Sequence, residues 1–144
     1  MKLDKDPYTR EEKLSSGFID IGSAKVSVVA TKTEIDFLFS LGKGNCFDDD
    51  CSAAISYTAT KAKTTIRNSG PTNCDGLFHF TFRNLASTPT NLQNLSIKPI
   101  TSIKFTDNTK KEIVVTLTEA QQTAFNNLAS CAVSEAKKKW PSSP

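Results

Sequence analysis

Apolar and polar residues alternate along most of this chain, and a period of two is typical of half-buried β-strands. The alternation is strong over 35–41 and clearest over 77–83, where three phenylalanines share one face. Shorter runs predict further strands at 18–21, 26–28, 53–60, 64–67, 100–105 and 113–117. Turn-forming residues separate these runs, as in NSGPTNCDG at 68–76, so neighbouring strands should be joined by turns.

The end of the chain has a different pattern, because its apolar residues recur at the spacing of an α-helix. Thr118 is placed to cap the first turn, and Gln121 follows three residues later as its capping-box partner. The predicted apolar stripe consists of Ala124, Phe125, Leu128, Cys131, Ala132 and Ala136. These features predict one C-terminal helix over about 118–139, and a short helical turn is expected near 92–95.

Strands that follow one another through turns favour antiparallel pairing, because parallel pairing needs long crossover connections and none is visible. The helix must bury its stripe against the apolar face of a sheet. The predicted fold class is therefore α+β: a curved antiparallel β-sheet or open barrel of roughly six to eight strands packed by one C-terminal α-helix. This order resembles the strand barrel with a terminal helix of pleckstrin-homology-like folds, and that resemblance implies no function.

A length of 144 residues predicts one domain with a core large enough to fold without cross-links. Residues 1–16 are charged and show no periodicity, so we expect a flexible N-terminal arm, with some order around Tyr8, before a single β-rich domain over 17–144. The net charge of +3 is small, and the one dense run, Lys137–Lys139, complements the dipole at the end of the predicted helix. A nucleic-acid partner is therefore not expected. No transmembrane segment is expected either, because no apolar run approaches about 18 residues.

Four cysteines are candidates for disulfide bonds: Cys46, Cys51, Cys74 and Cys131. Sequence alone leaves three ways of pairing them. Their spacing fits neither paired C-x₂-C zinc ligands nor a C-x-x-C redox motif. Cys46 and Cys51 flank a short loop, and Cys131 on the helix could reach Cys74 at the base of a strand. The leading prediction is therefore 46–51 with 74–131, and buried free thiols are the alternative.

The stretch GKGNCFDDDCSA at 42–53 also carries three consecutive carboxylates. Asp48, Asp49 and Asp50 are weak candidates for a metal site. A calcium loop places its carboxylates at alternate positions and adds a glycine and a distal glutamate, and this stretch does not match that spacing. We therefore interpret it as a solvated acidic turn, and no cofactor is expected.

Residues with catalytic potential are few. His79 is the only histidine, and strand parity places it on the face opposite the phenylalanines of 77–83, with Arg83 four residues further on. It lacks a motif partner for Cys–His chemistry. The chain contains no G-x-S-x-G, H-E-x-x-H or phosphate-loop motif. A pair of carboxylates that includes Asp36 or Asp75 is left open, because such pairs need no fixed spacing in a sequence.

Four stretches carry a resemblance: KDPYT at 5–9, FSLGKGNCFDD at 39–49, NSGPTNC at 68–74, and TSIKFTDNTKKEIVVTLTEAQQ at 101–122 followed by Cys131. Through these stretches, which are spread over most of its length, the chain resembles small exported proteins of unknown function from Bacteroidetes-type bacteria. The resemblance implies an envelope or secreted location, and it implies no activity and no site residues. We therefore expect an extracytoplasmic protein (periplasmic, outer-surface or secreted) whose export signal is not part of the printed sequence, with a cytoplasmic location as the alternative.

The function predicted from these observations is a non-enzymatic exported interaction or ligand-binding module. Its partner is expected to be a protein, a glycan or a small molecule. One alternative is a small-molecule or lipid-binding β-barrel, in which sheet and helix enclose an apolar cavity. The other is a hydrolase with an unrecognised carboxylate pair.

Overall fold

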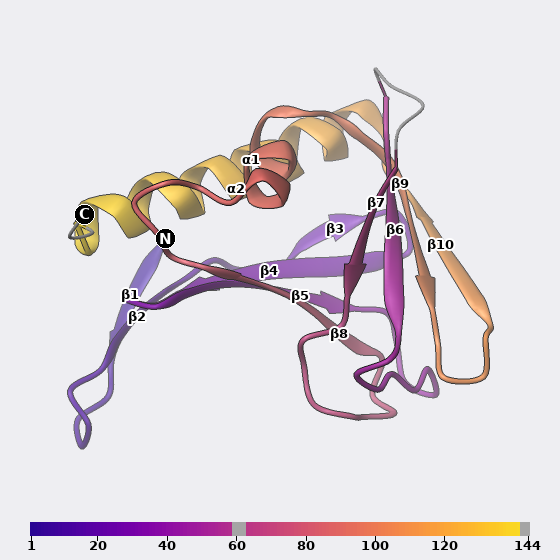
Figure 1. Ribbon diagram of the computed structural model, residues 1–144, viewed down its shortest axis with the longest axis horizontal. Helices are drawn as coiled ribbons and strands as arrows, with labels where there is room; N and C mark the ends of the chain where they lie inside the picture. The colour runs from indigo at the N-terminus through magenta and orange to yellow at the C-terminus, as the bar shows by residue number, and fades with distance from the viewer. Residues whose placement is uncertain (59–62, 142–144) are drawn as a thin grey trace.

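The computed structural model describes residues 1–58 and 63–141, which form two antiparallel sheets and two helices (Figure 1). The first sheet contains β1 (Lys2–Lys5), β2 (Glu12–Ser15), β3 (Ile19–Ile21), β4 (Ala24–Ala30), β5 (Glu34–Ser40) and β8 (Leu77–Arg83). The second contains β6 (Ser52–Tyr57), β7 (Lys63–Arg67), β9 (Ile100–Thr106) and β10 (Glu112–Thr116). The helices are α1 (Thr90–Ile97) and α2 (Glu119–Lys139). This arrangement confirms the predicted α+β class, with two sheets that are not closed into a barrel.

The first sheet has the strand order β1-β2-β4-β5-β8, with β3 paired to β4, and the second has the order β10-β9-β6-β7. Strands β5 and β8 pair along their whole length, up to Ser40 opposite Leu77. The loops at 41–51 and 68–76 therefore leave the same end of the sheet. The predicted end of the 53–60 strand and the turn after it lie outside the described residues.

Helix α2 begins as the sequence predicts. The Thr118 hydroxyl accepts the Gln121 N–H at 3.2 Å, and the Gln121 side chain accepts the Thr118 N–H at 3.1 Å. Its buried face differs from the predicted stripe, because Ala124 and Cys131 are exposed. The buried residues are Phe125, Ala129, Ala132 and Ala136, which recur at the spacing of one narrow helix face.

Phenylalanine rings fill the core between α2 and the two sheets. Phe125 of α2 stacks on Phe37 and Phe39 of β5, with ring centroids 5.8 and 6.2 Å apart. Phe105 of β9 lies 5.3 Å from Phe39 and 5.1 Å from Phe78 of β8. All five rings are fully buried. The helix and both sheets therefore share one core.

The connection between β8 and β9 contains helix α1, which is longer than the predicted turn at 92–95. Leu92 and Leu95 of α1 are buried. The Asn126 side chain of α2 donates hydrogen bonds to the carbonyl oxygens of Leu95 at 2.8 Å and Lys98 at 2.9 Å. Helix α1 is therefore fixed directly against α2.

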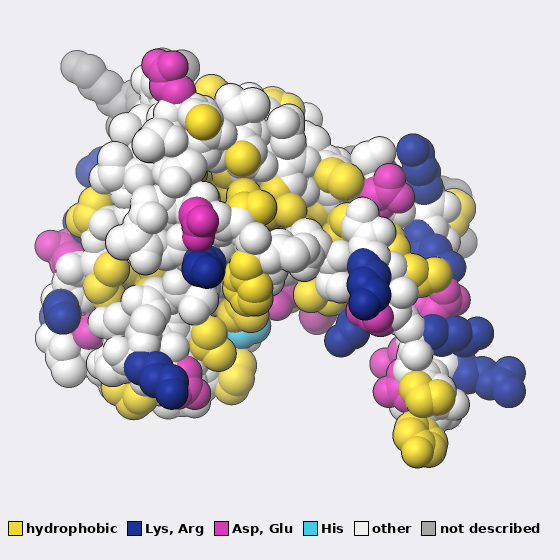
Figure 2. Space-filling model, turned by 180° about the vertical axis from the view of Figure 1, so that it is seen from behind, with side chains coloured by type: hydrophobic (Ala, Val, Ile, Leu, Met, Phe, Trp, Pro, Cys, Tyr) yellow, Lys and Arg dark blue, Asp and Glu magenta, His cyan; other side chains and the backbone are white. Residues whose placement is uncertain are grey.

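The N-terminal residues, which the sequence predicted to be a flexible arm, contain two strands. Strands β1 and β2 form an antiparallel hairpin, and Leu14 and Ser15 join it to β4. Leu14 is buried, whereas Tyr8 at the tip is 94% exposed and so does not order the segment. Because a single buried residue gives no periodic signal, the sequence pattern missed this hairpin, which projects from the rest of the molecule (Figures 1 and 2).

Buried Asp107 organises the turn between β9 and β10. Its carboxylate accepts hydrogen bonds from the hydroxyl and N–H of Thr109 at 2.7 and 2.9 Å, and from the N–H of Lys111 at 2.9 Å. The Thr109 hydroxyl, together with these N–H groups, lowers the pKa of Asp107 below its ordinary value of 3.8. The ionised carboxylate therefore stabilises the turn.

We expect Asp107→Asn to weaken the acid dependence of stability. Because the pKa of Asp107 is lower in the folded chain, its contribution is present above pH 3.8 and is lost as the pH falls through the lowered folded value. Urea unfolding between about pH 2 and pH 7 measures this slope. Exposed Asp20 provides the matched control, Asp20→Asn. Equal acid dependence in both variants would contradict the role of Asp107.

Candidate functional site

The acidic loop is held by a disulfide that the sequence did not predict. Cys46 is bonded to Cys74, whereas Cys51 is a buried free thiol and Cys131 an exposed one. The predicted pairing of 46–51 with 74–131 is therefore wrong. The pairing of β5 with β8 explains the observed bond, because it places the loop that follows β5 beside the loop that precedes β8. Phe47 of the first loop forms a β-bridge with Asn73 of the second, next to the disulfide.

The three aspartates form a turn with internal hydrogen bonds. A ligand oxygen from each of Asp48, Asp49 and Asp50 can lie within 4.8 Å of the others, and two of these residues are exposed. Asp48 accepts the backbone N–H of Asp50 at 2.9 Å, and Asp50 pairs with Arg67 at 3.0 Å. These contacts already give the carboxylates a structural role in the turn, and they favour the solvated acidic turn over a metal site.

Cys51 lies next to this turn. Its thiol donates a hydrogen bond to an Asp48 carboxylate oxygen at 3.4 Å. Burial raises the pKa of the Cys51 thiol, and the neighbouring Asp48 carboxylate acts in the same direction. A thiol with a raised pKa is a poor nucleophile at neutral pH, so Cys51 is better described as a buried core residue than as a reactive one.

His79 lies on the face opposite the phenylalanines, as predicted, and forms a polar cluster across β5 and β8. Its Nδ1 is 2.8 Å from Oδ2 of Asp36, and the Thr81 hydroxyl donates to Oδ1 of the same carboxylate at 2.7 Å. Arg83 is exposed and is not part of these contacts. Strand parity predicted the face on which His79 lies, but only the register of β5 against β8 brings it next to Asp36.

Gly70 packs against the other side of the His79 ring. A β-carbon at Gly70 would lie 2.1 Å from His79 Cδ2, so any larger residue here must displace the imidazole ring. The described hydrogen bonds of the imidazole include no hydroxyl or thiol nucleophile. An Asp–His pair of this kind can hold a ring in place or accept a proton, and it lacks the third member that nucleophilic catalysis requires. In Figure 2 the histidine (cyan) lies at the edge of the main body that faces the gap beside the projecting hairpin.

We expect Gly70→Ala to destabilise the protein by about 1–3 kcal/mol, because the new methyl group must displace the His79 ring from Asp36. Chemical denaturation gives the free energy of unfolding, and the imidazole NMR resonances report the ring position. Gly17→Ala is the matched control, since a β-carbon there meets nothing within 4 Å. An equal, small effect of the two changes would show that the ring is not locked by this contact.

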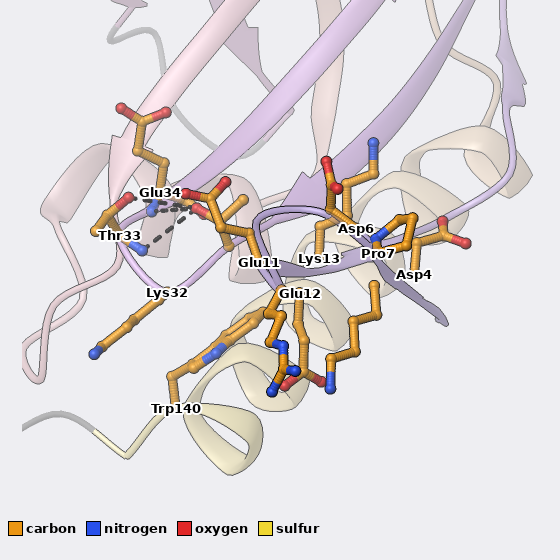
Figure 3. Close-up of a pocket in the computed structure, with 13 residues that line it drawn as sticks. Asp4, Asp6, Pro7, Glu11, Glu12, Lys13, Lys32, Thr33, Glu34 and Trp140 are labelled. Carbon is orange, nitrogen blue, oxygen red and sulfur yellow. Dashed lines mark hydrogen bonds between the residues drawn. The ribbon is translucent and has the colours of Figure 1, made fainter.

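A groove of about 820 Å³ opens at the end of the first sheet that lies away from the Cys46–Cys74 disulfide (Figure 3). Strand β2 pairs with β4 only through Leu14 and Ser15. Beyond these residues the hairpin diverges from the β4–β5 turn at 31–34, and Trp140 at the end of α2 lines the gap between them. The groove is therefore a consequence of the short pairing between β2 and β4.

Trp140 is held in position from two directions. Its backbone N–H donates to the Ala136 carbonyl at 2.9 Å, and its indole is partly buried against the core. The preceding residue, Lys139, pairs with Glu12 of β2 at 2.6 Å. The hydrogen bond from Lys139 lowers the pKa of Glu12. This ion pair ties the end of the helix to the hairpin across the groove.

The turn on the other wall is fixed by its own hydrogen bonds. The Thr31 hydroxyl accepts the N–H groups of Thr33 and Glu34 at 3.3 and 3.1 Å, and the Thr31 N–H donates to the Glu34 carbonyl at 2.7 Å. Asn84 donates from its side chain to the Thr31 carbonyl at 3.0 Å and from its backbone to the Thr33 carbonyl at 2.9 Å. Most backbone N–H and carbonyl groups of this wall therefore already have hydrogen-bond partners, and the side chains of the wall are available to a ligand.

Charged residues of both signs line the groove. The carboxylates are Asp4, Asp6, Glu11, Glu12 and Glu34, and the cations are Lys5, Arg10, Lys13 and Lys32. Sequence reasoning selected none of them, because most belong to the segment interpreted as an arm. A groove walled by a hairpin, a turn and a helix end leaves no local motif in a sequence.

No protein-family model, curated protein or solved structure matches the chain. Among the described residues, neither helix is long and apolar enough to cross a membrane. The functional interpretation therefore depends on the geometry and chemistry of the groove and of the Asp36–His79 cluster.

Proposed function

We propose that this protein is an exported, non-enzymatic binding module whose ligand or partner occupies the groove between the hairpin, the 31–34 turn and Trp140. The observation that carries the proposal is the groove itself. Its volume of about 820 Å³ lies within the range of small-molecule sites, and it combines one fixed aromatic side chain with polar groups on two walls.

A binding role is favoured over catalysis by the chemistry of the polar groups. The described hydrogen bonds of the His79 imidazole include no hydroxyl or thiol nucleophile, and the one buried thiol, Cys51, has a raised pKa. Asp36, which the hydrolase alternative named, accepts hydrogen bonds from a histidine and a hydroxyl. The lipid-binding alternative has no support in the described interior, where phenylalanine rings fill the space between the sheets.

An exported location is supported by the Cys46–Cys74 disulfide, because such bonds persist in oxidising compartments and are rare in the cytosol. The periplasm, the outer surface and the external medium all fit this chemistry. The cytoplasmic alternative predicts four thiols in freshly isolated protein, whereas export predicts the two thiols of Cys51 and Cys131.

Trp140 provides a direct test because it is the only tryptophan in the chain. Its fluorescence emission should shift when the protein is titrated with at least one of three pools: oligosaccharides, peptides or small metabolites. The shift should persist in Lys25→Ala, a change at the other end of β4, and should weaken in Lys13→Ala/Lys32→Ala. Unchanged emission with all pools, or equal shifts in both variants, would overturn the proposal.

A further inference from the structure

We infer that the groove takes a neutral carbohydrate, with one sugar ring placed against Trp140. This inference rests on the proposed function of the groove and narrows its ligand to one chemical class. Three features of the described residues lead to it: the balance of charge, the satisfied backbone of the walls, and the single fixed aromatic ring.

The charges of the groove cancel. Five carboxylates and four cations line it, and the ammonium group of Lys139 neutralises Glu12. An anionic ligand would meet the carboxylates, a cationic ligand would meet the cations, and an apolar ligand would strip water from all of them. Sugar hydroxyls both donate and accept, so a neutral sugar can donate to the carboxylates and accept from the lysines and the arginine.

The backbone around the groove argues against an extended peptide. A peptide that adds to a sheet needs a free strand edge several residues long. On the groove side of β2 only Glu12 and Lys13 lie beyond the pairing with β4. The opposite wall uses its own N–H and carbonyl groups within the turn and with Asn84. Recognition therefore falls to side chains, which suits a ligand rich in hydroxyl groups.

Trp140 supplies the apolar part of the site. Its indole is the only aromatic ring among the lining residues, and the Lys139–Glu12 pair beside it ties the helix end to the hairpin. A pyranose ring has one face of C–H groups that can pack on a flat aromatic surface, while its hydroxyl groups point to the sides. The partly buried indole ring can pack against the C–H face of a sugar, and the charged side chains around it can bind the hydroxyl groups.

The test is isothermal titration calorimetry of the full chain with neutral hexasaccharides: maltohexaose, cellohexaose, mannohexaose and N-acetylchitohexaose. Hexagalacturonate and a decapeptide of mixed charge are the competing probes. We expect one neutral sugar to bind, with a dissociation constant that changes less than about two-fold between 50 and 500 mM salt. Trp140→Ala should weaken binding about ten-fold or more, and Trp140→Phe, which keeps a flat ring, should remain within about three-fold.

The Trp140→Phe variant controls for folding, because it preserves the packing at the end of the helix. Binding of the uronate or the peptide, with no neutral sugar bound, would overturn the carbohydrate inference and leave the groove as a binding site. Binding of a neutral sugar that is insensitive to both Trp140 changes would also overturn it. Failure of every probe, together with unchanged emission in the three-pool screen, would overturn the proposed function itself.

Discussion

Replacing Phe105 by alanine should destabilise the protein by about 3–5 kcal/mol. The Phe105 ring is fully buried and lies 5.1–6.4 Å from three phenylalanine rings of the first sheet. Its removal leaves a cavity at the junction of the two sheets, where neighbouring rings are held by their strands and close the space only in part. Urea denaturation followed by circular dichroism measures the change in the free energy of unfolding.

Phe18→Ala is the matched control, because it makes the same chemical change at a side chain that is 54% exposed. We expect it to cost less than about 1 kcal/mol. If the two variants are equally stable, the two sheets do not share the phenylalanine core described above.

Removing the disulfide should have the second largest effect. The double change Cys46→Ser/Cys74→Ser opens a loop with a sequence separation of 28 residues. The chain-entropy model gives such a cross-link about 3–4 kcal/mol, because the bond restricts the unfolded chain. Thermal and chemical denaturation of the oxidised protein and the double variant measure the difference.

Cys131→Ser provides the control, since this thiol is exposed and unpaired. It should change the stability by less than about 0.5 kcal/mol. Intact mass should fall by about 2 Da between the reduced and oxidised protein, the loss of two hydrogens for one disulfide. A loss of about 4 Da, or a large effect of Cys131→Ser, would contradict Cys46–Cys74 as a single disulfide and favour a second bond.

Local periodicity predicted the strands and the long helix well. Over the described residues, each of the eight predicted runs overlaps a strand of the structure, and the capping box at Thr118 and Gln121 begins α2 as expected. These features depend on neighbouring residues, whose spacing is visible in one sequence. The N-terminal hairpin was missed because its only buried anchor, Leu14, sits in a charged stretch without a second apolar residue on the same face.

The long-range features could not be read from spacing. The bond between Cys46 and Cys74 and the meeting of Asp36 with His79 both depend on the pairing of β5 with β8, whose partners lie 37 to 49 residues apart. The groove depends on where the pairing of β2 with β4 stops. Trp140 directly follows the predicted helix, and its role in the groove follows from the hairpin beside it.

The proposed binding site is tested most directly by NMR chemical-shift mapping of the ¹⁵N-labelled chain with a ligand that shifts the Trp140 emission. The account predicts that the Trp140 indole N–H and the amides of 4–13 and 31–34 move together and saturate at one ligand per chain. Shifts confined to the Asp36–His79 cluster or to the acidic turn at 48–50, with the groove resonances unchanged, would contradict it.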